Sequence, residues 1–289
     1  MVKNKKMKAI LFMLLSSLSF AIMGSFVKLA GDVPTFEKAF FRNLISLMIS
    51  IYLLNRIKQN PWGKKENRIY LIGRGVVGTL GMVAYFYGID RLILADSGML
   101  NKMNPFFVTI FAWIFLKNKI SKTQIYSLFI ALIGVAFIIK PSSNFIQSVP
   151  AVICFMSSIF AGGAYVFVSY LSDKENSYTI VFYFSLISTI ITFPLLMMNP
   201  VMPNKIQFLF LILTGIASSI GQFCLTIAYK YAPAGEVSIY NYSNVIFSSV
   251  LGIILFSEKP GLLSLIGYIF IIFAGYLVYK IGNRRRQIK

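Results

Sequence analysis

Histidine is absent from this 289-residue chain, and acidic residues are scarce, with nine Asp and Glu against 28 Lys and Arg. Without histidine there is no Ser-His-Asp or Cys-His nucleophile, no His-ligated metal and no imidazole proton relay. The two cysteines, Cys154 and Cys224, both lie inside apolar segments, which favours packed thiols over a disulfide. The sequence also lacks a glycine-rich phosphate loop ending in Lys-Ser or Lys-Thr, which disfavours a primary pump. We therefore expect no cofactor.

Apolar residues are abundant instead. The chain is 57% hydrophobic and only 13% charged, which is too apolar for a soluble domain of this size, so we expect lipid around it. The net charge of +19 comes from short basic runs between apolar segments. That arrangement is typical of membrane topology and does not indicate a nucleic-acid partner. We expect the first apolar segment to be a retained helix rather than a cleaved signal.

The apolar segments have the lengths of membrane-spanning helices, which need about 20 residues each. They lie near residues 7–29, 35–56, 69–88, 95–116, 123–140, 150–171, 178–198, 207–231, 235–257 and 261–281. With a cytoplasmic N-terminus, the inner connections carry 19 basic residues and the outer ones five, which predicts that both termini are cytoplasmic. The expected fold is an all-α polytopic protein of the cytoplasmic membrane with ten transmembrane helices.

The chain contains an internal duplication. Residues 78–137 align on residues 218–277 without a gap, at a constant shift of 140 positions, and Asn101 falls on Asn241. Weaker matches extend the repeat to the earlier segments, which gives an N-terminal half over residues 1–145 and a C-terminal half over residues 146–289. Since each half has an odd number of predicted spans, the halves are predicted to be inverted five-helix repeats. This architecture is typical of secondary transporters with a shared central cavity.

Three stretches carry a family resemblance: FFRNLISL from residue 40, LADSGMLNKMNPFFVTIFAWIFL from residue 94 and SEKPGLLSLIGYIFIIFAGYL from residue 257. Over its whole length the chain resembles the EamA-type branch of the drug/metabolite transporter superfamily. The resemblance implies that the first, third, fourth, sixth, eighth and ninth helices line a central cavity. It also implies an amino acid, metabolite or related solute as substrate, often carried outward.

The chain departs from the family's pattern after the fourth predicted span. Where the family tends to have a Gly-Glu pair, this chain has Leu-Lys-Asn-Lys at residues 116–119. The second half keeps the acidic residue as Glu258, to which we assign no role at this point.

Four basic residues lie inside the predicted spans. A charge at the centre of a membrane helix costs about 2.5 to 3.5 kcal/mol on insertion scales, so such residues are functional candidates. Lys28 and Arg74 lie near the ends of their segments, and we expect both to reach lipid headgroups. Lys102 and Arg42 lie about 10 Å from the outer boundary. Both are predicted to contact the substrate, and a positive cavity would favour a carboxylate-bearing solute.

Two acidic residues suggest a structural role for Lys102 and Arg42 as the alternative to substrate binding. Asp96 and Glu37 are candidate ion-pair partners of the two deeper basic residues, in which case those residues are structural. Asp96 and its repeat mate Glu236 begin predicted helices at opposite membrane faces. They are candidate gating or proton-coupling groups, and the alternative is that each carboxylate stabilises a helix N-terminus.

Neutral polar residues complete the candidate site. The eighth predicted span has a polar stripe that we expect to face inward, which makes Gln222 a candidate substrate contact. Asn101 and Asn241 either bind substrate or form hydrogen bonds between helices. Tyr85, Tyr165 and Tyr242 are candidate aromatic walls, with packing or membrane-interface anchoring as the alternative.

The sequence therefore predicts a secondary transporter that moves a small polar metabolite, such as an amino acid or organic acid, by alternating access. The alternatives are a carrier of organic cations or drugs and a lipid-linked flippase. A membrane-embedded enzyme is less favoured, because the acidic residues are single and scattered. The expected partners are the solute and the bilayer, with no nucleic acid. Gly267 and Gly275 in the last span are consistent either with a homodimer or with close helix packing within the chain.

Overall fold

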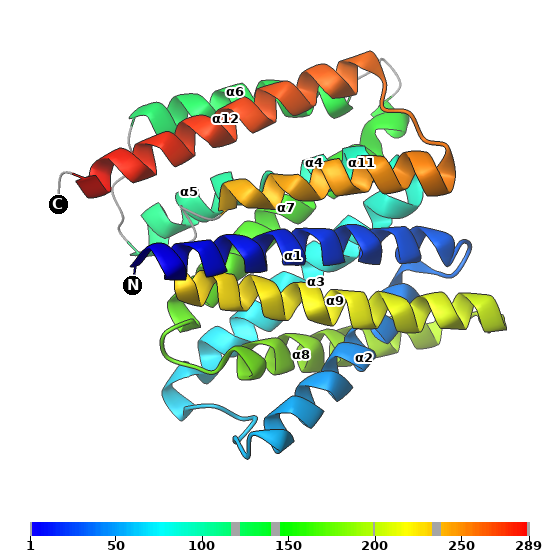
Figure 1. Cartoon of the computed structure of the whole chain (residues 1–289). Coiled ribbons are helices and arrows are strands. Elements are labelled where there is room, and N and C mark those ends of the chain that lie inside the picture. Colours follow the sequence, from blue (N-terminus) through cyan, green and yellow to red (C-terminus); the bar gives the residue numbers. More distant parts are fainter. Residues whose placement is uncertain (1, 117–121, 140–144, 199, 233–237, 288–289) are drawn as a thin grey trace.

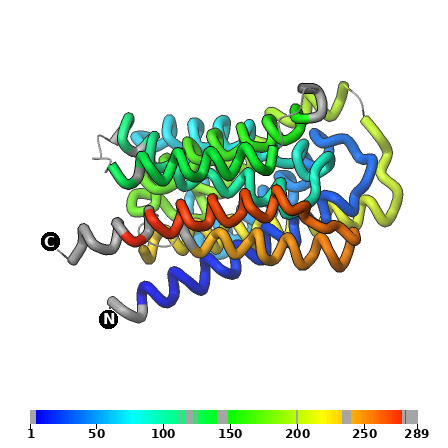
Figure 2. The backbone as a smooth tube through the Cα atoms, turned by 90° about the horizontal axis from the view of Figure 1, so that it is seen from above, coloured from blue at the N-terminus to red at the C-terminus, as the bar shows by residue number. Residues whose placement is uncertain are grey.

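A computed structural model describes the chain except for residues 1, 117–121, 140–144, 199, 233–237 and 288–289. Every regular element of the described residues is a helix. The elements are α1 (Val2–Leu29), α2 (Thr35–Arg56), η1 (Lys65–Asn67), α3 (Arg68–Arg91), α4 (Leu94–Asn101), α5 (Asn104–Leu116), α6 (Lys122–Ile139), α7 (Phe145–Leu171), α8 (Ser177–Met198), α9 (Lys205–Tyr231), η2 (Ser238–Tyr242), α11 (Ser243–Phe256) and α12 (Leu262–Gln287). The long helices run roughly along one axis, and α1 begins at the end of the bundle where α12 finishes (Figures 1 and 2).

Five helices of the described residues are long and apolar enough to cross a membrane: Lys5–Leu29, Lys65–Arg91, Ser148–Leu171, Ser177–Met198 and Lys205–Tyr231. Three apolar helices are shorter: Ile125–Ile139, Tyr240–Phe256 and Leu262–Leu277. The set of ten predicted spans is therefore not confirmed. Helix α2 has the length of a span, but it carries Glu37, Lys38 and Arg42 in its first turns.

Contacts between the two halves recur in matching pairs. Helix α1 packs along α9 and α3 packs along α7, while α2 contacts α8 and α6 contacts α12 (Figure 1). Gly81 and Gly221, which are 140 positions apart, allow α3 to pack closely on α7 and α9 to pack closely on α1. A Cβ added to Gly81 would lie 3.1 Å from the Cβ of Phe160, and one added to Gly221 would lie 2.9 Å from the ring of Phe20. Phe20 and Phe160 are themselves 140 positions apart.

The prediction of one continuous helix over residues 95–116 is wrong. The segment forms two helices, α4 and α5, which are interrupted at Lys102 and Met103. At the equivalent place in the second half, the 3-10 helix η2 is followed directly by α11 after Tyr242.

Proline explains the interruption in the first half. Pro105 has no backbone N–H, so the carbonyl of Asn101 loses its normal helical partner four residues later. The Nδ2 atom of Asn104 donates a hydrogen bond to this carbonyl at 2.8 Å and satisfies it. The chain can therefore leave the helix inside the bundle without a buried, unpaired carbonyl.

The glycines that suggested a dimer face lie at contacts within the chain. The backbones of Gly134 in α6 and Gly267 in α12 approach so closely that a Cβ on either glycine would collide with the carbonyl oxygen of the other. Gly275 packs against the ring of Tyr242. These small residues are thus used to join α12 to the rest of the bundle.

Candidate functional site

A polar pocket lies in the middle of the bundle, between side chains from α1, α2, α3, α4, α7, α8 and α9. Its cavity volume is about 70 Å³, which is enough for a few water molecules. Three of the lining residues are basic, namely Arg42, Arg74 and Lys102. The neutral polar residues of the lining are Asn101, Gln222, Tyr85 and Tyr165. The pocket thus contains six of the predicted substrate-contacting residues and one, Arg74, that was not predicted.

Arg42 reaches the pocket from α2. Its side chain is only 2% exposed, and its Nη1 atom donates to the Oδ1 of Asn43 at 2.5 Å and to the sulfur of Met82 at 3.3 Å. The guanidinium carbon lies 5.0 Å from the ring centroid of Phe184, a cation–π distance. Among the described residues Arg42 forms no ion pair, so the predicted alternative of a pair with Glu37 is not observed. The Glu37 carboxylate instead accepts the backbone N–H of Val201 at 3.3 Å.

Arg74 enters the same pocket from α3, and the expectation that it reaches lipid headgroups is wrong. The residue is 3% exposed, and its guanidinium carbon lies 4.1 Å from the centroid of Phe184. Its Nη2 atom donates to the Oε1 of Gln222 at 3.3 Å. A Cβ on Gly78 would collide with the Arg74 guanidinium, so glycine makes room for this side chain along α3.

Lys102 lies at the interruption between α4 and α5. It is 4% exposed, and its Nζ atom lies 5.6 Å from the ring centroid of Phe20. Among the described residues Lys102 forms no ion pair, which removes the predicted alternative of a pair with Asp96. The broken helix therefore presents an ammonium group to the pocket next to an aromatic ring.

The described lining of this pocket contains no carboxylate. Three buried cations without counter-charge are energetically unfavourable in a region of low dielectric constant. An anionic ligand would supply the missing charge. No group of three His, Cys, Asp or Glu residues that could hold a metal ion occurs in the described part of the chain.

The two repeat-related asparagines form matching hydrogen bonds between the halves. The Nδ2 of Asn101 donates to the hydroxyl of Ser157 at 2.9 Å, and the hydroxyl of Ser17 donates to the Oδ1 of Asn241 at 3.2 Å. Ser17 and Ser157 are also 140 positions apart. Asn101 additionally lines the pocket, whereas Asn241 is not part of its lining.

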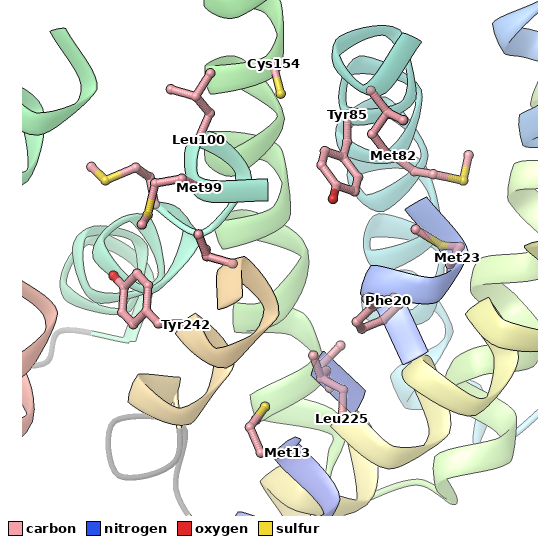
Figure 3. Close-up of a cluster of buried hydrophobic side chains, with 14 of the residues drawn as sticks. Met13, Phe20, Met23, Met82, Tyr85, Met99, Leu100, Cys154, Leu225 and Tyr242 are labelled. Atoms are coloured by element: carbon pink, nitrogen blue, oxygen red, sulfur yellow. The ribbon is translucent and has the colours of Figure 1, made fainter. Parts of the chain in front are cut away.

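The predicted aromatic residues have different positions. Tyr85 lies on α3 beside Phe20 and Met23 of α1, and all three line the pocket (Figure 3). Tyr165 also lines the pocket and contacts the ring of Tyr229 edge-on, with 6.1 Å between centroids. Tyr242 is buried against α12 and is not part of the pocket lining.

Asp96 lies outside the pocket lining. Its carboxylate accepts hydrogen bonds from the hydroxyl of Tyr268 at 2.6 Å and from the hydroxyl of Ser264 at 3.1 Å, both on α12. The side chain therefore connects α4 to the last helix. Glu236, its predicted counterpart, lies outside the described residues.

Lys28 and Glu258 form an ion pair at one end of the pocket helices. Lys28 also donates to the carbonyl of Leu92 at 2.7 Å, and the second oxygen of Glu258 accepts the backbone N–H of Leu94 at 2.7 Å. We call these four residues the end clamp. It ties the ends of α1 and α11 to the connection between α3 and α4, so the expectation that Lys28 reaches headgroups is wrong.

Comparison with known proteins agrees with this arrangement. Residues 7–140 and 149–280 each match the sequence profile described as the EamA-like transporter family. The chain belongs to the EamA-like transporter family. One matched segment lies in each half of the sequence, and the resemblance inferred from the three sequence stretches is confirmed.

Individual relatives cover nearly the whole chain. The pseudopaline exporter CntI of Pseudomonas aeruginosa is 34% identical over 276 residues, which cover 95% of this chain and 96% of the exporter. Human solute carrier family 35 member G1 is 28% identical over 86% of this chain and 72% of its own length. A solved crystal structure with 15% identity superposes with a TM-score of 0.66 and covers 98% of both chains. That structure supports the fold alone.

Membership in the EamA-like family makes this chain a multi-pass membrane transporter and bears out the predicted function at that level. The family and the names of the relatives indicate a transporter rather than an enzyme. Sequence reasoning missed Arg74 and Phe184 in the pocket. The available signal was the spacing of Arg74, Gly78, Gly81 and Tyr85, which places them on one face of α3.

Proposed function

We propose that this EamA-like transporter is a secondary carrier that moves a small carboxylate-bearing metabolite, such as an amino acid or organic acid, across the cytoplasmic membrane. The observation that carries the proposal is the set of three buried cations, Arg42, Arg74 and Lys102, in a pocket whose described lining contains no carboxylate. Gln222, Asn101 and Tyr85 supply neutral hydrogen-bonding groups beside them. The relative named as a pseudopaline exporter supports outward transport of a metabolite.

We propose alternating access between two inverted repeats as the mechanism. Matching contacts across the halves support it, because Asn101 and Ser157 are related to Asn241 and Ser17 by the same 140-position shift. The interruption between α4 and α5, beside the polar pocket, is also typical of this class of carrier. The pocket, at about 70 Å³, has room for waters rather than a metabolite, so binding requires the halves to move apart.

Asp96 is proposed to couple or gate the movement of α4. Its hydrogen bonds to Tyr268 and Ser264 extend to α12, so protonation or displacement of the carboxylate would weaken the attachment between these helices. Glu236 is proposed to have the equivalent role in the second half.

A lipid-linked substrate is the second candidate, and one feature favours it. An apolar cleft of about 540 Å³ lies between α3, α5 and α7, and its lining includes Val77, Phe111, Phe167 and Tyr170. Val77 and Gly163 of this cleft are sequence neighbours of Gly78 and Ala164 in the polar pocket. The cleft would accommodate an acyl or isoprenoid chain while the pocket binds an anionic head.

Thermal unfolding of the detergent-purified protein tests the proposal. The wild type and Lys102→Met are heated with amino acids, organic acids, nucleosides and organic cations. A ligand that binds only the folded state raises the apparent melting temperature by mass action. We expect carboxylate-bearing solutes to stabilise the wild type and to lose most of this effect in the variant. Equal stabilisation of both proteins by organic cations would contradict the proposal and make Lys102 a structural residue.

A further inference from the structure

We propose that the pocket recognises a solute with at least two anionic groups, one bound by the Arg42 and Arg74 pair and another by Lys102. The proposal rests on the proposed function as an anion carrier and narrows its substrate class. Under this proposal, a solute with a single carboxylate is not the preferred substrate.

The arginine pair forms the first anionic subsite. The guanidinium carbons of Arg42 and Arg74 lie 5.0 Å and 4.1 Å from the centroid of the same ring, Phe184. The hydrogen-bond acceptors found for their side chains, Asn43, Met82 and Gln222, are all uncharged. The Nε atoms of both arginines have no hydrogen-bond partner among the described residues. Unused donors on two neighbouring guanidinium groups suit a carboxylate or phosphate, which can accept several hydrogen bonds at once.

Lys102 forms the second subsite. It lies near Phe20 of α1 rather than Phe184 of α8, so it approaches the pocket from a different side than the arginines. Its position at the break between α4 and α5 also places it on a different element from either arginine. An ammonium group interacts with an anion as a compact point charge and adds no planar recognition.

Charge balance then sets the minimum number of anionic groups. Three unit charges in a water-poor interior need compensation from the ligand, because the described lining provides none. A monocarboxylate would neutralise one of them and leave two. A dianion or trianion would neutralise two or three, so affinity should rise with each added carboxylate. Gln222 and Asn101 lie where they can bind further polar groups of the same solute.

A matched series of carboxylates tests this inference. Butyrate, glutarate and tricarballylate carry one, two and three carboxylates, and glycerol 3-phosphate provides a phosphate dianion. Binding is measured by thermal shift at constant ionic strength with wild type, Arg74→Gln, Arg74→Lys and Lys102→Met. The control is Arg91→Gln, which removes an exposed arginine that stacks on Tyr87 outside the pocket.

We expect glutarate to bind the wild type about tenfold more tightly than butyrate, a difference typical of one added charge pair. This ratio should fall to about threefold or less in Arg74→Gln and in Lys102→Met. It should persist in Arg91→Gln and be partly restored in Arg74→Lys, which keeps the charge. Tighter binding of glutarate than of butyrate supports the proposal. Glycerol 3-phosphate carries both charges on one group, so binding as tight as that of glutarate would overturn the requirement for two separate anionic groups.

Two other outcomes separate this inference from the proposed function. Equal binding of butyrate and glutarate to the wild type, with loss of both in Lys102→Met, would overturn the dianion proposal and leave a monoanion carrier. Failure of every anion to bind the wild type would overturn the proposed function itself.

Discussion

At the scale of single residues, Gly78 determines where the guanidinium of Arg74 can lie. The two residues are four positions apart on one face of α3, and the Arg74 side chain occupies the space that a Cβ at position 78 would need. The ring of Phe184 lies 2.9 Å from the same point. A single methyl group would therefore disturb the arginine and the aromatic ring that it contacts.

Gly78→Ala is predicted to displace Arg74 and weaken binding of glutarate by about tenfold, because the guanidinium pair would be separated. Overpacking should also destabilise the fold by about 1 to 3 kcal/mol. Thermal shift with and without glutarate measures both effects. Gly98→Ala is the control, since its Cβ would meet its nearest neighbour at an ordinary 3.4 Å. Unchanged glutarate binding in Gly78→Ala would show that Arg74 does not need this position.

Part of the candidate site was predictable from the sequence, because a polar residue inside an apolar segment indicates a buried side chain with a functional role. This reasoning predicts Lys102, Arg42 and Gln222, and the structure brings them together in one pocket. Their contact with a substrate stays a prediction. The sequence does not predict Arg74 as a pocket residue, because its position near the end of a span is equally compatible with a side chain that reaches the headgroups. Depth along a helix does not give the direction of a side chain, which here points inward.

At the scale of elements, the interruption between α4 and α5 depends on two adjacent residues. Pro105 removes the N–H that would have bonded to the carbonyl of Asn101, and the side chain of Asn104 replaces it. The proline thus creates an unsatisfied acceptor and the asparagine satisfies it locally.

Asn104→Ala should destabilise the protein by about 1 to 3 kcal/mol, because the buried carbonyl of Asn101 loses its donor. Adding Pro105→Ala should recover part of this loss, since the restored N–H can bond to the same carbonyl. Chemical or thermal unfolding of the two single variants and the double variant measures the coupling. Strictly additive effects would mean that Asn104 does not compensate for the proline.

The repeat was predictable at this scale and the continuity of the helices was not. Ungapped alignment of the halves is a property of the sequence, and contacts such as those at Gly81 and Gly221 follow the same shift. Hydrophobic length alone predicted one helix over residues 95–116, because an apolar run does not reveal a local break. Pro105 causes this break, whereas the hydrogen bond by which Asn104 satisfies the freed carbonyl is visible only in the folded structure.

At the scale of the whole molecule, the distribution of basic residues predicts the orientation in the membrane. The connection around Gln59 lies at the basic, predicted inner side, and the connection around Met202 lies at the predicted outer side. Both residues are exposed, with Met202 96% accessible.

In a background with Cys154 and Cys224 replaced by alanine, Met202→Cys should react with a membrane-impermeant maleimide in intact cells. Gln59→Cys should react only after the cells are opened. Gel-shift labelling measures both, and a denatured sample of each variant shows that the introduced thiol can react. The reverse pattern would contradict cytoplasmic termini.

The end clamp also makes the two ends of the carrier unequal. Glu258 joins Lys28 to the backbone of Leu94, but the position 140 residues earlier in the chain is Asn118, which cannot supply a carboxylate. Under the proposed alternating access between inverted repeats, one end closes with this ion pair, and the repeat-related position at the other end supplies no carboxylate for the same contact. A carrier whose two ends are held closed by unequal contacts would spend more time in one access state. Opening the end that the Lys28–Glu258 ion pair holds closed would then be the slow half of the turnover cycle, even with equal solute concentrations on both sides.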